Sequence, residues 1–264
     1  MIHPTAIIDP SAQLHADVQV GAYSIIGARS EIGSGTRIRP HAVIGSDTRI
    51  GSDCEIFQFA SVGEDPQDLS YRGEQTRLEM GDRCVIREGV TMSRGTEKGG
   101  GVTRIGSDGL FMAQVHVAHD CQVGNGVIFS NAASLAGHCE IGDHATLGGF
   151  SLIHQFSLIG RRAFTSMGAA LNRDLPPFCL ASGNYARAIG INKVGLRRAG
   201  ISAEAIQALQ HAFRVMVRQR QGSAGAAQLA PLMAQHPEVE EFVAFIQASK
   251  RGVLRSGRQV TGIE

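Results

Sequence analysis

The stretch "VGAYSIIGARSEIGSGTRIRPHAVIG", from Val20 to Gly45, places an aliphatic residue at every sixth position. An α-helix repeats every 3.6 residues and a flat strand every two, so neither sustains a beat of six. Hexapeptide repeats of this kind build a parallel β-helix. Three hexads then form one coil of about eighteen residues, with the aliphatic side chain of each hexad pointing inward.

The six-residue spacing extends through most of the chain. It runs from Ile2 to Val62, and glycine follows six of these residues directly. It lapses over residues 63–79, returns in phase at Met80, lapses again over residues 93–104, and runs one residue out of phase from Ile105 to Ile159. We therefore predict a long coil with two loop interruptions.

The chain beyond the repeats has helical spacing. We expect a β-helix over residues 1–184 and a helical cap domain over residues 185–264. In the cap, Ser202 is a suitable N-cap for a helix with apolar residues at three- and four-residue steps. A second helix starts near Pro237 and stops at Gly252, and a short one covers residues 229–235, with "QGSAGAA" before it as a turn or linker.

Composition excludes several classes of protein. The five cysteines form no C-x-x-C pair and are odd in number, which disfavours a disulfide framework and indicates a reducing, cytoplasmic compartment. No segment approaches the roughly 20 apolar residues of a membrane span, so no membrane insertion is expected, and the net charge of +1 gives no reason to expect nucleic-acid binding.

Charge is divided along the chain. From Tyr185 onward there are 11 Lys and Arg against 5 Asp and Glu, a net charge of +6, whereas the preceding residues carry 14 against 19. A basic cap suits phosphates or an acidic protein partner, although a solvated helix surface explains the charge equally well.

A histidine-rich segment lies in the second half of the repeats. "QVHVAHDCQVGNG", residues 114–126, contains His116 and His119, with Asp120 next to the latter. Residues eighteen apart lie in one column on successive coils, about 4.8 Å apart. His119, Gly137 and Gln155 therefore share a column, Asp120 and His138 share the adjacent one, and His154 lies beside them.

This gathering of residues is suited to acyl transfer. Neutral imidazole can take the proton of a sugar hydroxyl. Asp120 can orient His119, but neighbours on a strand usually point in opposite directions, so another carboxylate or a carbonyl can fill that role. Gly137 has no side chain, so its backbone N–H can approach a developing oxyanion. Cys121 and Cys139 share a column and are expected to be packing residues.

Several motifs together resemble a known enzyme family. "HVAHDCQVGN", "LAGHCEIGD", "LIHQF", "IREGVT", "PQDL" and "NKVGLRRAG" resemble the cytosolic UDP-N-acetylglucosamine O-acyltransferases that begin lipid A synthesis, over nearly the whole chain. The resemblance implies a left-handed β-helix, a homotrimer without metal or cofactor, and transfer of an (R)-3-hydroxyacyl group from acyl carrier protein to the sugar 3-hydroxyl.

The resemblance also assigns roles to individual residues. His119 matches the general base and Gly137 the oxyanion-binding amide, while Asp68, Asn192 and Arg198 match sugar and nucleotide contacts. Met167 stands where relatives limited to ten-carbon chains carry methionine, which implies a ten-carbon acyl group. The remaining positions that match substrate contacts are His116, His138, His154 and Gln155.

The chain departs from the family pattern near the sugar-nucleotide groove. Ser70 stands in place of a lysine and Ser93 in place of a histidine. Val194 replaces a glutamate, Tyr185 a histidine and Ala199 an arginine. We therefore expect the acyl-transfer residues to be retained and the nucleotide-sugar contacts to be altered, with a weaker enzyme, a paralogue or a 3-amino acceptor as the alternatives.

Three other functions are weighed against this one. Gamma-class carbonic anhydrases hold zinc on the same fold, but their paired histidines are typically spaced H-x-x-x-x-H, whereas His116 and His119 are three apart. A CoA-dependent acetyltransferase differs in its acyl donor. A non-catalytic scaffold gives no reason for histidines to gather beside a glycine.

Overall fold

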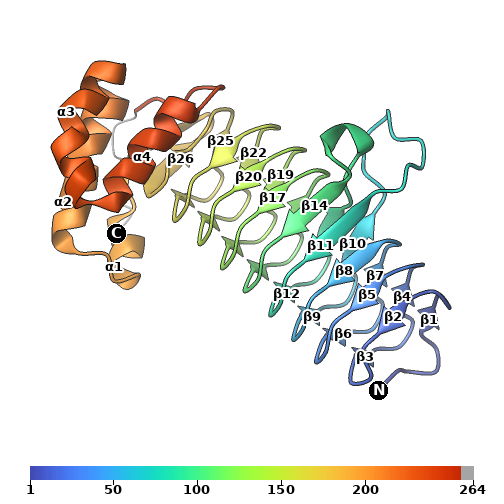
Figure 1. Cartoon of the computed structure of the whole chain (residues 1–264). Helices are drawn as coiled ribbons and strands as arrows, with labels where there is room; N and C mark the ends of the chain where they lie inside the picture. Colours follow the sequence, from blue (N-terminus) through green and yellow to red (C-terminus); the bar gives the residue numbers. More distant parts are fainter. Residues whose placement is uncertain (257–264) are drawn as a thin grey trace.

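The computed structural model describes residues 1–256, which form a rod of stacked coils with a group of helices at one end (Figure 1). The rod is a left-handed parallel β-helix. Each coil contributes one short strand to each of three sheets. Strands of successive coils pair in parallel at an offset of eighteen residues, as with Ile7 and Ile25, and at a larger offset where a loop intervenes. The prediction of a β-helix from the hexads is therefore confirmed.

Within residues 1–256 the sheets have nine, eight and ten strands. The nine-stranded sheet comprises β1 (Ile7–Ile8), β4 (Ile25–Ile26), β7 (Val43–Ile44), β10 (Ser61–Glu64), β13 (Thr91–Ser93), β16 (His116–Val117), β19 (Ser134–Leu135), β22 (Leu152–Ile153) and β25 (Ala170–Leu171). The eight-stranded sheet comprises β2 (Gln13–Leu14), β5 (Glu31–Ile32), β8 (Thr48–Ile50), β11 (Arg77–Met80), β14 (Val102–Ile105), β17 (Gln122–Val123), β20 (Glu140–Ile141) and β23 (Leu158–Ile159). The ten-stranded sheet comprises β3 (Gln19–Val20), β6 (Arg37–Ile38), β9 (Glu55–Ile56), β12 (Val85–Ile86), β15 (Leu110–Phe111), β18 (Ile128–Phe129), β21 (Thr146–Leu147), β24 (Phe164–Thr165), β26 (Cys179–Gly183) and β27 (Ala186–Ile191).

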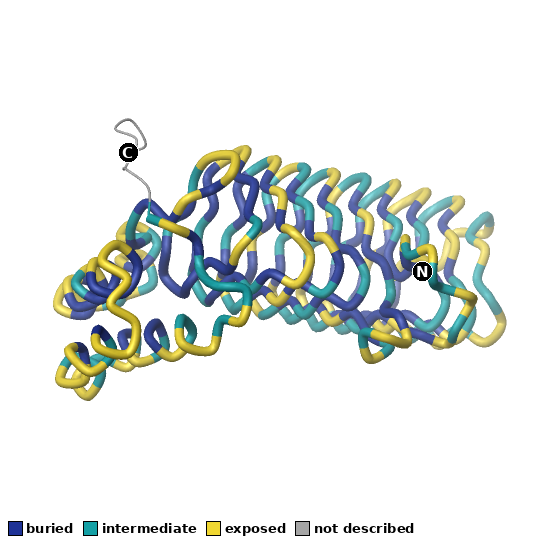
Figure 2. Tube along the Cα trace, turned by 90° about the horizontal axis from the view of Figure 1, so that it is seen from above, coloured by how far each residue is buried: buried dark blue, intermediate teal, exposed yellow. Residues whose placement is uncertain are grey.

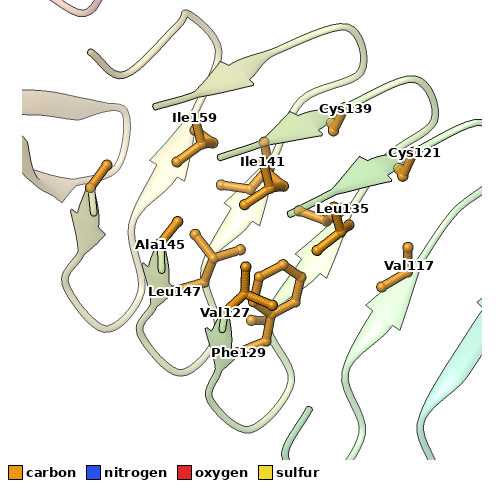
Figure 3. Close-up of a cluster of buried hydrophobic side chains, with 14 of the residues drawn as sticks. Val117, Cys121, Val127, Phe129, Leu135, Cys139, Ile141, Ala145, Leu147 and Ile159 are labelled. Carbon is orange, nitrogen blue, oxygen red and sulfur yellow. The ribbon is translucent and has the colours of Figure 1, made fainter. Parts of the chain in front are cut away.

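The hexad residues fill the interior of the rod. From Val20 to Ile159, each residue on the six-residue beat is at most 5% exposed, and Figure 3 shows such side chains converging from neighbouring coils. Burying an aliphatic or aromatic side chain of this size stabilises the fold by roughly 1.5–3 kcal/mol. The first coil is the exception, with Ile2 51% exposed and Ile8 and Leu14 half-buried, because no coil lies beneath it.

Most turns between sheets use a left-handed backbone conformation at a non-glycine residue. Asp120, His138 and Phe156, eighteen residues apart, have φ of 62°, 62° and 61°. Asp and His tolerate this region better than most residues. The turns form the corners of the rod, where exposed and half-buried positions alternate with buried ones (Figure 2).

The two predicted interruptions are loops that project beside one another from the rod (Figure 1). They cover residues 65–76 and 94–101, and the second contains a short 3-10 helix, η1 (Glu97–Gly99). Both are shorter than the lapses in the beat, because β11 and β14 pair with each other before the beat returns. Arg94 joins the loops by an ion pair with Asp65 and a 3.1 Å hydrogen bond to the Tyr71 hydroxyl.

The coil ends in an antiparallel hairpin of β26 and β27. The expected domain boundary, between residues 184 and 185, falls in the turn of this hairpin, and the division into two domains stays a prediction. The helical segments that follow are α1 (Lys193–Arg198), α2 (Ala203–Phe213), the π-helical η2 (Arg214–Arg218), α3 (Gly222–Gln235) and α4 (Pro237–Ala248).

The helix starts were predicted better than the other bounds. Ser202 caps α2 by accepting from the Ala205 N–H at 3.1 Å, and Pro237 opens α4. The turn expected over "QGSAGAA" is wrong, because α3 begins at Gly222. A Cβ at Gly225 would lie 2.8 Å from a Val215 methyl carbon, so the small residue permits close helix packing that outweighs its low helix propensity.

The predicted stop at Gly252 is also wrong, because α4 ends at Ala248. Beyond it the chain returns to the last coil, where the Ser249 hydroxyl donates to Asp174 at 2.6 Å and Leu254 is buried. Among the helices of residues 1–256, none combines the length and hydrophobicity that a membrane crossing requires.

Candidate active site

His119 and Asp120 follow β16 at a corner of the rod and form a direct pair. Nδ1 of His119 lies 2.8 Å from Oδ2 of Asp120. Strand neighbours point in opposite directions, but these two residues lie in a turn, and the positive φ of Asp120 brings its carboxylate to the side of the imidazole. Asp120 can therefore orient His119 although the two residues are neighbours in sequence. The side chain of His119 is 15% exposed and that of Asp120 only 1%.

The buried Asp120 carboxylate is fully engaged by hydrogen-bond donors. Oδ1 accepts from the Thr96 backbone N–H at 2.8 Å, and Oδ2 accepts from the Thr96 hydroxyl at 2.6 Å. The backbone N–H of Asp120 donates to the Thr103 hydroxyl at 2.8 Å. A buried carboxylate is tolerated when its oxygens are satisfied in this way.

Gly137 lies one coil above His119, as the eighteen-residue column predicts. A Cβ at Gly137 would lie 2.7 Å from Cε1 and 2.9 Å from Nε2 of His119, so the imidazole packs directly over the glycine backbone. Among the described residues, the Gly137 N–H donates no hydrogen bond within the protein. An unpaired N–H beside an imidazole is a suitable donor for an oxyanion.

The adjacent column stacks Asp120, His138 and Phe156 on successive coils. The His138 ring lies flat against Phe156, with centroids 4.4 Å apart, and meets His119 edge to face at 5.1 Å. Nε2 of His138 lies 3.7 Å from Oδ2 of Asp120. His138 is thus held on three sides and has a side chain 24% exposed.

The other histidines lie around this centre. Nδ1 of His116 lies 2.8 Å from the Thr91 hydroxyl oxygen. Burial lowers the pKa of His116, and the neighbouring His119 adds to that effect. Nδ1 of His154 lies 3.1 Å from the Gln155 carbonyl and 3.2 Å from a guanidinium nitrogen of Arg251.

The first loop contributes Asp68 and Ser70. Asp68 accepts from the Ser70 N–H at 2.8 Å, and this contact, followed by the Ser70 hydroxyl, lowers the pKa of Asp68. His119 adds a smaller electrostatic contribution to the lowered pKa. Arg94 ties the first loop to the second, in which Thr96 contacts Asp120.

Three predicted substrate-binding residues lie apart from this centre. Met167 and Asn192 follow β24 and β27 of the ten-stranded sheet and Arg198 lies on α1, whereas His119 follows β16 of the nine-stranded sheet. Asn192 is the N-cap of α1 and accepts from the Gly195 N–H at 3.0 Å. Met167 is 79% exposed, and Arg198 is exposed near the end of α1.

The altered positions and the cysteines also have defined places. Ser93 is 5% exposed at the end of β13, whereas Tyr185 and Val194 are 72% and 58% exposed. Ala199 follows α1 as its C-cap. All five cysteines are buried free thiols, which agrees with packing roles for Cys121 and Cys139.

Within the described residues, His119, Asp120 and His138 are the one group whose geometry could hold a metal ion. Their ligand atoms lie within 4.8 Å of one another. However, both Asp120 oxygens accept hydrogen bonds from Thr96, and one also contacts His119. This saturated carboxylate fits the orientation of an imidazole better than the coordination of zinc.

Sequence reasoning missed Thr96, Phe156 and Arg251 at the site. Thr96 had a detectable signal. Thr91 pairs with His116, and the same register carried four residues further places Gly95 below Asp120, so Thr96 had to lie nearby. Arg251 had none, because only the return of the chain after α4 brings it to His154.

The fold and this centre together define the class of left-handed β-helix acyltransferases built from hexapeptide repeats. The chain is 51% identical over 255 residues to the acyl-[acyl-carrier-protein]–UDP-N-acetylglucosamine O-acyltransferase of Alkalilimnicola ehrlichii, covering 96% of this chain and 99% of the relative. It therefore belongs to the family of acyl-[acyl-carrier-protein]–UDP-N-acetylglucosamine O-acyltransferases.

Further comparisons agree. The enzyme of that name from Thiobacillus denitrificans is 49% identical over 255 residues, with 96% of this chain and 99% of the relative covered. The solved UDP-N-acetylglucosamine O-acyltransferase (LpxA) of Moraxella catarrhalis matches with a TM-score of 0.93 and 44% identity, covering 96% of this chain and 99% of that one. A family model described as UDP N-acetylglucosamine O-acyltransferase, domain 2, matches residues 174–254.

Proposed function

We propose that this chain transfers an (R)-3-hydroxyacyl group from acyl carrier protein to the 3-hydroxyl of UDP-N-acetylglucosamine, the first step of lipid A biosynthesis. The relatives that it matches over 96% of its length are named for transfer between these substrates. The observation that carries the proposal is the His119–Asp120 pair, with a 2.8 Å contact, beside the Gly137 N–H, which has no acceptor among residues 1–256.

The geometry supports a general-base mechanism. An ionised carboxylate only accepts hydrogen bonds, so Nδ1 of His119 carries the proton toward Asp120, and the lone pair on Nε2 is left to take the proton of the sugar hydroxyl. The hydroxyl oxygen then attacks the thioester carbonyl, and the Gly137 N–H donates to the oxyanion. Collapse of the tetrahedral adduct breaks the carbon–sulfur bond, and the imidazolium returns its proton to the departing thiolate.

The five altered positions bear on the identity of the acceptor. Ser70 is a short neutral side chain and Ser93 is no imidazole, whereas the family pattern that the motifs resemble has a lysine and a histidine at these two positions. Fewer charged contacts weaken binding of a nucleotide diphosphate. An acceptor bearing a 3-amino group is the alternative that these substitutions leave open.

The partners and the assembly belong to the same proposal. The net charge of +6 from Tyr185 onward suits acyl carrier protein, which is acidic. Met167 lies on a different corner from His119 and is 79% exposed, so an acyl chain reaches both residues most simply between two subunits of a homotrimer. A cytoplasmic location is part of the proposal.

An acyl-transfer assay tests this function. Purified protein is given ten-, twelve- and fourteen-carbon 3-hydroxyacyl carrier proteins, each with UDP-N-acetylglucosamine or its 3-amino analogue. We expect transfer to one acceptor and none from the matching acyl-CoA donors. Transfer from CoA alone would favour the acetyltransferase alternative, and activity that requires stoichiometric zinc would favour the metal site.

A further inference from the structure

We infer that Thr96, in the second loop, is a positioning residue for the reaction, because it fixes the Asp120 carboxylate in the orientation that His119 requires. The inference rests on the proposed function and extends it to a loop that interrupts the hexads. Thr96 is 5% exposed and has no place in the general-base mechanism itself.

Thr96 makes both of its contacts with the carboxylate through donors. Its backbone N–H reaches Oδ1 at 2.8 Å and its hydroxyl reaches Oδ2 at 2.6 Å. Two donors on two oxygens set the rotation of the carboxylate plane, as a bidentate contact does. Oδ2 is the oxygen that Nδ1 of His119 contacts, so the same orientation directs the imidazole.

The direction of the Thr96 hydroxyl proton is itself determined. The hydroxyl oxygen accepts the Gly99 N–H at 3.2 Å as the N-cap of η1. A hydroxyl has one proton, and Asp120 offers an acceptor only, so this proton points to the carboxylate. The cap of η1 and the support of Asp120 are therefore one hydrogen-bonded chain.

The loop also packs directly against the carboxylate. A Cβ at Gly99 would lie 2.0 Å from Cγ of Asp120 and 2.2 and 2.3 Å from its two oxygens. No side chain fits there without displacing Asp120. The close approach of the Gly99 backbone is independent of the Thr96 contacts, and it leads to the same interpretation.

The loop is held in place at both ends. The Gly95 N–H donates to the Arg77 carbonyl at 3.2 Å, and the Arg77 N–H donates to the Gly101 carbonyl at 2.9 Å. Arg94 is tied to the first loop by its contacts with Asp65 and Tyr71. Such anchoring gives a supporting residue the rigidity that precise orientation needs.

The test compares Thr96→Val with Thr96→Ser. Valine has the shape of threonine but donates no hydrogen bond from its side chain, whereas serine keeps the hydroxyl. We expect Thr96→Val to lower kcat about 10- to 100-fold, with KM for both substrates within about threefold of wild type. Thr96→Ser should restore most of kcat. Nitrogen-15 NMR of His119 should show a smaller fraction of the Nδ1–H tautomer in Thr96→Val.

Thr36→Val is the matched control, because Thr36 lies on the coil, is buried like Thr96, and donates its hydroxyl proton to the Gly51 carbonyl at 2.9 Å. It should lose stability without a selective loss of kcat. His119→Ala, assayed alongside, separates the positioning role of Thr96 from the proposed acyl-transfer function. If His119→Ala is inactive while Thr96→Val matches wild type in kcat and tautomer, this inference fails and the proposed function stands. If wild-type protein transfers no acyl group, the proposed function fails.

Discussion

Gly137 is a residue where the geometry leaves no room for a side chain unless the His119 ring moves. The His119 ring lies over it, with Cε1 only 2.7 Å from the position of an added Cβ. The absent side chain therefore serves two purposes, since it leaves room for the base and keeps the backbone N–H open to the substrate oxygen.

We predict that Gly137→Ala displaces the imidazole and lowers kcat about a hundredfold, because a shift of about 1 Å in a catalytic group has an effect of that size. The coil should stay folded, because the φ of Gly137 is not in the left-handed region that favours glycine. Steady-state kinetics and a thermal melt measure the two effects. Wild-type kcat in a folded Gly137→Ala variant would show that the imidazole is not held as described.

Met167 is the residue that we expect to set acyl length. Its thioether occupies volume that the last methylenes of a longer chain need, and each excluded methylene forfeits about 0.8 kcal/mol. Three or four methylenes give roughly 2–3 kcal/mol, or about a hundredfold preference for the shorter chain. Met167→Gly should therefore admit fourteen-carbon donors and lose selectivity for ten-carbon donors.

Competition between ten- and fourteen-carbon donors measures this preference directly. A preference unchanged in Met167→Gly would remove Met167 as the determinant, and the ten-carbon assignment with it. The alternative explanation, that Met167 is only a packing residue, predicts that outcome.

At the scale of elements, the strands of the coil follow from the sequence, whereas the bounds of loops and helices depend on contacts distant in sequence. The six-residue beat predicts which strands stack because one inward side chain per strand is needed in every coil. It misses the start of β14, whose first residues are ordered by pairing with β11. Among the helices, the first turns of α3 are missed by the apolar spacing, because they depend on the packing of Gly225 against Val215.

The candidate active site also contains features that the repeat predicts and features that depend on contacts distant in sequence. The column of His119, Gly137 and Gln155 is predictable because it depends only on the eighteen-residue repeat. The repeat does not determine whether His119 and Asp120 contact each other, because the contact depends on the left-handed backbone of Asp120. The register places Thr96 near Asp120, but the hexads do not give the loop conformation that brings both Thr96 donors to the carboxylate.

The first loop is the element in which we expect acceptor binding to be altered. Ser70 is half-buried, and its backbone N–H donates a hydrogen bond to the Asp68 carboxylate. Ser70→Lys should tighten binding of UDP-N-acetylglucosamine, if that is the acceptor, by adding a charge-assisted contact to phosphate. Calorimetric titration of both variants with the nucleotide sugar measures this. Weaker or equal binding in Ser70→Lys would indicate a groove built for another acceptor.

At the scale of the whole molecule, the helices are fastened to the last coils by contacts from two directions. Arg161 on the coil forms a bidentate ion pair with Glu241 of α4, in which Nε donates to Oε1 at 3.1 Å and Nη2 donates to Oε2 at 2.6 Å. The segment after α4 returns to the coil, where Leu254 donates to the Asp174 carbonyl at 2.8 Å. This return carries Arg251 to His154, so the helical part and the candidate active site share a hydrogen-bonded contact.

The central claim is that His119 takes the proton of the acceptor during acyl transfer. The most direct measurement is single-turnover acyl transfer by His119→Ala, with His15→Ala as the control, since His15 is exposed on an early coil. We predict that His119→Ala loses at least the 10²–10⁴-fold that a general base contributes while thermal melting shows a folded coil, and that His15→Ala retains wild-type activity. A folded His119→Ala protein with activity within about tenfold of wild type would contradict the account.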